Sequence, residues 1–73
     1  MTEEANDPFR ADYERARKQV AAEIAVAEET GDWSGVVAYQ AAVDDAFRLR
    51  TVTAWHRGIV DEIDVLARRK RLN

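Results

Sequence analysis

The segment Gly31-Asp32-Trp33-Ser34-Gly35 constrains the fold most, because it is the only place where two glycines fall close together. The chain on both sides is rich in alanine and charged residues, which is typical of long helices. A glycine just after a helix adopts a positive φ without a Cβ clash, so we expect a helix to end at Gly31. A connection this short places two helices side by side and antiparallel. The sequence therefore predicts a helical hairpin with its hinge at these five residues.

The first helix is predicted to begin at Asp7-Pro8, since aspartate is a favoured N-cap and proline suits the first helical position. Its apolar residues recur at the spacing of three and four that is typical of an amphipathic helix. They are Phe9, Tyr13, Ala16, Val20, Ile24 and Ala27. Residues 1–6 lack this pattern and are predicted to be a disordered N-terminus, which leaves 7–73 as a single helical domain.

The apolar pattern changes phase after the second helix. The two helices of the hairpin are expected over about 8–30 and 33–50, and the inner face of the second comprises Val36, Tyr39, Val43, Ala46 and Phe47. A further apolar stripe consists of Val52, Trp55, Ile59, Ile63 and Leu66. At the helical period these two faces point roughly 170° apart.

Two all-α arrangements accommodate this change. In one, a C-terminal helical extension over about 52–70 continues from the second helix, straight or bent, and offers its stripe to another chain. In the other, the chain breaks near residues 50–53, where a threonine can cap a third helix, and forms a compact three-helix bundle. Because neither glycine nor proline occurs at 50–53, the continuous or bent helix is the preferred interpretation.

Composition narrows the possible classes of protein. The chain has 73 residues, a net charge of −3 and no cysteine, so disulfides and thiolate metal sites are excluded. It has no apolar run long enough for a signal peptide or a membrane span, and we expect a cytoplasmic protein. A core this small gains from association, so a homo-oligomer, most simply a dimer, is expected. Its many arginines and alanines suggest a bacterial or phage source.

No enzymatic site is evident in the sequence. The single histidine, His56, and the single serine, Ser34, lie far apart. Acidic pairs at 28–29 and 44–45 and the acidic group at 61–64 lack the spacing of a calcium loop and are interpreted as solvated faces. We expect no catalytic residue, metal, cofactor or small-molecule substrate.

The C-terminal third carries the functional hypotheses. A tryptophan and aliphatic residues on one helical face suit a protein partner, so the stripe at Val52, Trp55, Ile59, Ile63 and Leu66 is predicted to bind one. The protein would then be a small regulator or adaptor. The basic run Arg68, Arg69, Lys70 and Arg71 fits the favourable position of cations at a helix C-terminus, and alternatively a contact with nucleic-acid phosphates or an acidic partner. Binding to a membrane surface fits poorly, because acidic residues would face anionic lipid.

Two partial resemblances involve the hinge. Gly31-Asp32-Trp33 followed by Val36 and Tyr39 resembles the turn and second helix of a tetratricopeptide unit, over about 30 residues, although nothing repeats. Trp33-Ser34-Gly35 also resembles the small secreted hairpins named for a Trp-x-Gly turn, which usually dimerise. Their Tyr-x-x-x-acid export signal is not matched, because Tyr39 is followed four residues later by Val43. No functional residue is carried over from either family.

Overall fold

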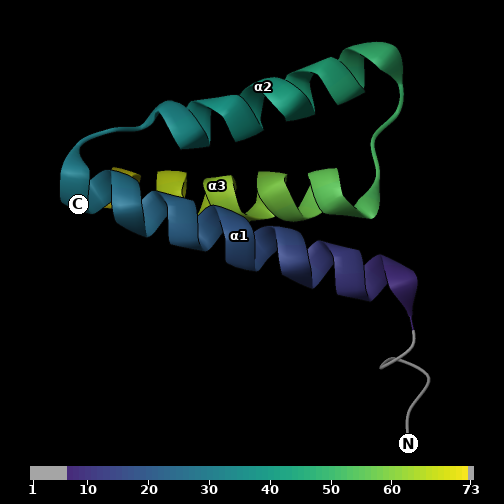
Figure 1. Cartoon of the computed structure of the whole chain (residues 1–73), viewed down its shortest axis with the longest axis horizontal. Coiled ribbons are helices and arrows are strands. Elements are labelled where there is room, and N and C mark those ends of the chain that lie inside the picture. Colours follow the sequence, from purple (N-terminus) through teal and green to yellow (C-terminus); the bar gives the residue numbers. More distant parts are fainter. Residues whose placement is uncertain (1–6, 73) are drawn as a thin grey trace, which may run out of the picture.

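The computed structural model describes residues 7–72, which form three α-helices. Helix α1 spans Pro8–Thr30, α2 spans Ser34–Leu49 and α3 spans Ala54–Leu72. Helices α1 and α3 run in the same direction, and α2, which lies between them in the sequence, runs in the opposite direction (Figure 1). The predicted all-α class is confirmed. The disorder expected for residues 1–6 lies outside the described residues.

Both ends of α1 form where the sequence predicts them. The Asp7 side chain accepts a hydrogen bond of 3.0 Å from the amide of Phe9, and Pro8 occupies the first helical position. At the other end Gly31 adopts φ 81°, and its amide donates to the carbonyl of Ala27 at 2.7 Å. An aspartate cap and a left-handed glycine therefore delimit this helix.

The hinge is held by short-range polar contacts. The Asp32 carboxylate accepts a hydrogen bond of 3.0 Å from the Ser34 amide, at the start of α2. The Thr30 hydroxyl accepts from the Asp32 amide at 3.2 Å and donates to the Val26 carbonyl at 2.8 Å. Trp33 packs against the core. The two helices are thus joined as predicted.

The preferred continuous helix does not form, and the chain breaks after Leu49. Arg50 adopts a left-handed conformation with φ 59° and ψ 42°. The amide of Thr51 donates to the Ala46 carbonyl at 2.8 Å, which is the bond that closes a Schellman motif. The structure therefore has the alternative arrangement, three packed helices. The absence of glycine was misleading because an arginine takes the left-handed position here.

Thr53 directly precedes the third helix, where the alternative arrangement expected a threonine. The Thr53 amide donates to Nδ1 of His56 at 3.0 Å, and the Thr53 hydroxyl lies 2.9 Å from the same nitrogen. The bond from the Thr53 amide is one half of a capping box, with histidine in place of the usual glutamate or glutamine. The break is therefore built from local hydrogen bonds on both of its sides.

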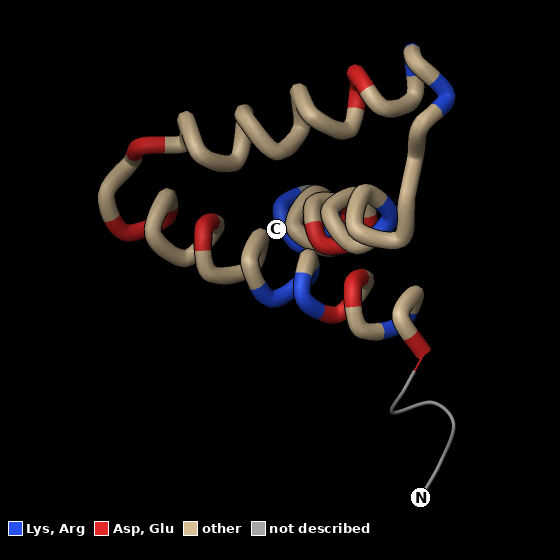
Figure 2. Tube along the Cα trace, turned by 45° about the vertical axis from the view of Figure 1, so that its right-hand side comes forward, with Lys and Arg blue, Asp and Glu red and all other residues tan. Residues whose placement is uncertain are grey.

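The core lies where the three helices meet. Its buried side chains come from all of them, and Ile59, Val20 and Val43 are the largest that are fully buried. The cluster comprises Ala16, Val20, Ile24, Ala27, Val36, Val43, Ile59 and Leu66. The most extensive helix pair is α1 with α3, and α3 is inclined to the other two helices (Figure 2). The main interface thus joins the two helices that are furthest apart in sequence.

Candidate protein-binding surface

The predicted partner stripe lies inside the molecule. Ile59 is fully buried and Leu66 is 8% exposed, while Trp55 and Ile63 are half-buried against the core. Val52 is also half-buried. The stripe therefore packs within the chain, as the three-helix alternative expected, and is not offered on the surface.

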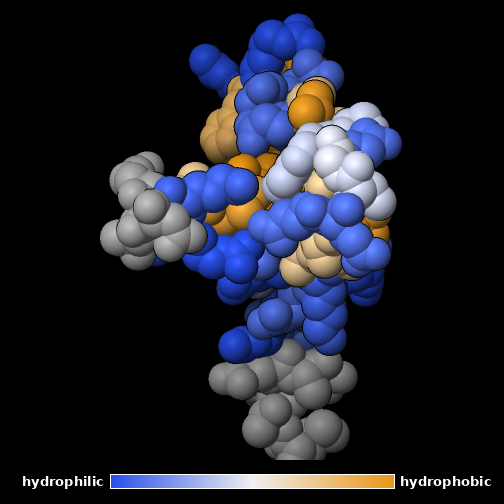
Figure 3. All heavy atoms as spheres, turned by 90° about the vertical axis from the view of Figure 1, so that its left-hand side faces the viewer, coloured by the Kyte–Doolittle hydropathy of each residue, from blue (hydrophilic) through white to orange (hydrophobic). Residues whose placement is uncertain are grey.

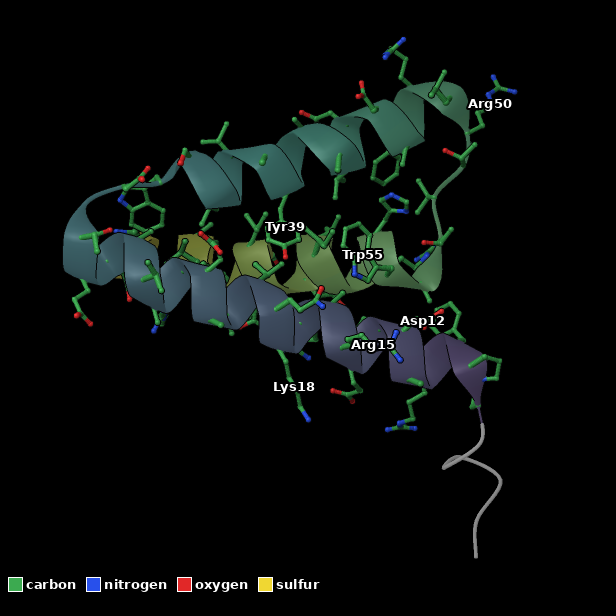
Figure 4. The ribbon with its side chains drawn as sticks, viewed as in Figure 1. Asp12, Arg15, Lys18, Tyr39, Arg50 and Trp55 are labelled. Atoms are coloured by element: carbon green, nitrogen blue, oxygen red, sulfur yellow. The ribbon has the colours of Figure 1, made fainter. Side chains whose placement is uncertain are left out.

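Trp55 is held by contacts from both other helices. Its ring lies 5.9 Å from that of Tyr39 on α2 (Figure 4), and its indole nitrogen donates to the Gln19 side chain on α1 at 3.3 Å. His56 meets the Trp55 ring edge-on at 5.4 Å. These contacts give Trp55 a structural role at the junction of the three helices.

The basic run also has partners within the chain. Arg68 forms an ion pair with Asp64, and Arg69 lies 3.8 Å from the Glu28 carboxylate on α1. The Lys70 ammonium is 5.4 Å from the centre of the Trp33 ring, which is the distance of a cation–π contact. Arg71 lies in the last turn of α3 and its side chain is outside the described part. Arg69 and Lys70 thus connect the end of α3 to the end of α1 and to the hinge.

Polar contacts join α1 to α3 along one side. The Tyr13 hydroxyl donates to Asp61, and Arg17 forms a 2.9 Å ion pair with Glu62. The hydrogen bond to Asp61 raises the pKa of Tyr13, and burial adds to this effect. The hydrogen bond to Glu62 raises the pKa of Arg17 above its ordinary value. Two of the acidic positions read as solvated from sequence therefore position the helices.

The groups that could bind a metal ion are dispersed over the described part of the chain. Among residues 7–72 no group of three or more histidines and carboxylates could hold a metal ion. His56 is engaged in the α3 cap, and Ser34 lies at the start of α2. The structure does not bring these two residues together.

Large apolar side chains from three helices are exposed around one hollow. Phe9 on α1 is 52% exposed, Phe47 on α2 is 60% exposed and Val60 on α3 is 37% exposed. The hollow has a volume of about 410 Å³, and Tyr13, Arg57 and Asp61 complete its lining. The Phe9 and Tyr13 rings stack with centres 6.5 Å apart. Exposed aromatic side chains thus cluster around this hollow, outside the buried core.

A second hollow of about 310 Å³ lies beside the first, between α2 and α3. Phe47 and Val60 line both. Its other lining residues are Gln40, Val43, Asp44, Ile63, Asp64 and Ala67. We call the two neighbouring hollows together the Phe47 groove. Most of its lining residues are apolar, and its acidic residues are Asp44, Asp61 and Asp64.

Sequence reasoning assigned Phe47 to the inner face of the second helix, and that assignment is wrong. The buried positions of α2 are Val36, Val43 and Ala46, and Phe47 lies at the border of that face. Phe9 precedes Ala16, the first buried residue of α1, by almost two turns. Both phenylalanines matched the helical period, but the period alone does not give the width of the buried face.

A further recess lies between α1 and α3. It has a volume of about 230 Å³ and is lined partly by the charged residues Glu28, Glu62 and Arg69. At the end of the molecule that carries the hinge, hydrophilic side chains separate the visible hydrophobic atoms (Figure 3). The Phe47 groove is the better candidate for a binding surface, because the exposed aromatic side chains of Phe9 and Phe47 line it and not this recess.

Comparisons with known protein families, with characterised proteins and with solved structures give no match to this chain. Within residues 7–72, none of the three helices is both long and apolar enough to cross a membrane.

Proposed function

We propose that this chain is a small, non-enzymatic protein–protein interaction module that binds its partner through the Phe47 groove. The observation that carries the proposal is the exposure of Phe9, Phe47 and Val60, from three helices, around one hollow. Clustered exposed apolar side chains with a polar rim are typical of interaction sites. Aromatic residues supply much of the energy in such contacts. The role as a regulator or adaptor, with a cytoplasmic location and a bacterial or phage source, belongs to this proposal.

The groove has a firm frame on its α3 side. Val60 follows Ile59, which is fully buried, and Tyr13 is hydrogen-bonded to Asp61 across the α1–α3 interface. Side chains fixed in this way lose little freedom on binding, so more of the contact energy contributes to affinity. The core and the groove therefore share the same supporting contacts.

Self-association through residues 52–66 is no longer supported, because that stripe packs inside the chain. A dimer would have to use the Phe47 groove or another surface. The nucleic-acid alternative finds less support, because Arg68, Arg69 and Lys70 have acidic or aromatic partners within the chain. The protein-binding function is thus preferred.

The proposal is tested by comparing Phe47→Asp with Val37→Asp in affinity purifications from cells of the source organism. Both side chains belong to α2 and are about equally exposed, at 60% and 63%, but Val37 does not line the groove. We expect the Val37→Asp protein to retain the partners of the original chain and the Phe47→Asp protein to lose them. Equal partner sets for folded samples of both variants would contradict the proposal.

A further inference from the structure

We infer that the occupant of the Phe47 groove is an amphipathic helix that carries arginine or lysine beside its apolar stripe, an inference that rests on the proposed function. The first reason is shape. On α3 the groove is lined from Arg57 to Ala67, which is about 15 Å, or nearly three helical turns, at the α-helical rise. Apolar anchors one turn apart on a bound helix would meet Phe47, Val60 and Ile63 in succession.

The second reason is charge. The groove walls contain three carboxylates and one cation, Arg57. Asp44 is hydrogen-bonded at 3.0 Å to the neutral amide of Gln40, and Asp61 accepts from the neutral hydroxyl of Tyr13. Neither of these contacts neutralises the carboxylate, whereas Asp64 is paired with Arg68. Two acidic groups are therefore available to a basic partner.

The distribution of charge along α2 also favours a basic partner. The charged residues of α2 are Asp44, Asp45 and Arg48, all in its C-terminal half, where the groove lies (Figure 2). Asp45 is paired with Arg48 at 2.8 Å, which leaves Asp44 as the acidic group of α2 that lines the groove. The bound helix would place a cation against Asp44 and its apolar stripe against Phe47.

A second copy of the chain is a poorer occupant. A two-fold symmetric contact applies the same patch to itself, so two surfaces that each carry three carboxylates and one cation would meet. Like charges brought together in an interface oppose binding. A basic helix instead brings opposite charge to both walls.

The experiment uses two labelled synthetic helical peptides of about four turns, with leucines spaced one turn apart. Arginines flank the leucines in one peptide, and glutamates replace the arginines in its twin. Fluorescence anisotropy with the full chain is expected to show binding of the arginine peptide at least about tenfold tighter than that of its twin, and weaker binding as salt rises. Amide chemical-shift changes should fall on residues 9–13, 40–47 and 57–67, which line the groove.

Matched charge variants locate the contact. Asp44→Lys should weaken binding of the arginine peptide about fivefold, the size expected for an exposed charge pair. Glu29→Lys makes the same change of net charge on α1, outside the groove, and should leave the affinity unchanged within about twofold. Equal effects of both variants would show attraction to the overall charge and overturn the inference.

Each other outcome is also decisive. Tighter binding of the glutamate twin at the groove would overturn the basic partner and leave the proposed function standing. If neither peptide bound and light scattering showed a dimer that Phe47→Asp dissociates, the occupant would be a second copy. If neither peptide bound to a monomeric chain, the inference would fail, whereas the proposed function would still be judged by the purifications with Phe47→Asp and Val37→Asp.

Discussion

Gly58 on α3 lies directly against the backbone of Tyr13 on α1. A Cβ at residue 58 would overlap the Tyr13 carbonyl oxygen and come within 2.8 Å of Cβ of Ala16. Both obstacles are parts of a helix that cannot move aside without separating α1 from α3. The close approach of the two helices therefore requires glycine at this position.

We expect Gly58→Ala to lower the free energy of unfolding by about 1–3 kcal/mol, the usual cost of overpacking, despite the better helix propensity of alanine. Urea denaturation followed by circular dichroism measures this difference. Gly35→Ala is the control, because the three atoms nearest to the added Cβ belong to the flexible side chain of Glu23 and not to a backbone. A Gly58→Ala protein as stable as the original would show that the helices can separate freely.

Arg50 should be replaceable by glycine with a gain in stability. Its φ of 59° is a left-handed conformation, which costs a non-glycine residue about 1 kcal/mol. Arg50→Gly is expected to raise the free energy of unfolding by about 0.5–1 kcal/mol, and Arg50→Val to lower it. Thermal unfolding of the two variants should move in opposite directions. A lower unfolding temperature for Arg50→Gly than for the original chain would mean that the Arg50 side chain makes a stabilising contact.

His56 should contribute to stability as an N-terminal cap rather than as a reactive group. Its Nδ1 accepts from the Thr53 amide, so His56→Ala leaves that donor without its partner and should cost about 1 kcal/mol. His56→Glu restores the usual capping box and should recover most of the loss. Chemical denaturation of both variants makes the comparison, and equal losses would contradict the capping role.

Acid should weaken the hinge through Asp32. Hydrogen bonds from the Ser34 side chain and then from the Ser34 amide lower the pKa of Asp32 in the folded chain. The charged form is thus favoured by folding, so its contribution is complete above the unfolded pKa of about 3.9 and is lost as pH falls through the lower folded pKa. A carboxyl NMR titration should find a lowered pKa for Asp32 that rises in Ser34→Ala. If the pKa of Asp32 were the same in Ser34→Ala as in the original chain, the hydrogen bond from the Ser34 side chain would not be what lowers it.

The capped ends and the hinge could be predicted because short-range chemistry determines them. Asp7-Pro8 and Gly31 act on amides and carbonyls within a few residues, and the structure has each as expected. The reversal of the apolar face after Phe47 was also a sound signal, because the second face packs inside the bundle. The three-helix alternative placed the break correctly near residues 50–53. The preference for a continuous helix was wrong because Arg50 takes the left-handed conformation that is usually adopted by glycine.

The candidate site was harder to predict because it depends on which side chains the packing leaves uncovered. Phe47 and Val43 are one turn apart and look equivalent in sequence, but Val43 is 2% exposed and Phe47 is 60% exposed. The helical period does not show which of these two positions the packing covers. Gly58 sets the approach of α3 to α1, and its importance could be recognised only when Tyr13 was found opposite.

The parallel pairing of α1 and α3 has a consequence for how the chain acquires its structure during synthesis. The hairpin of α1 and α2 emerges from the ribosome first, but the largest helix–helix interface needs α3. Contacts such as that of Arg17 with Glu62 join positions separated by 45 residues. The nascent hairpin therefore keeps much of its apolar surface uncovered until α3 has been synthesised. Folding can then proceed as one cooperative event.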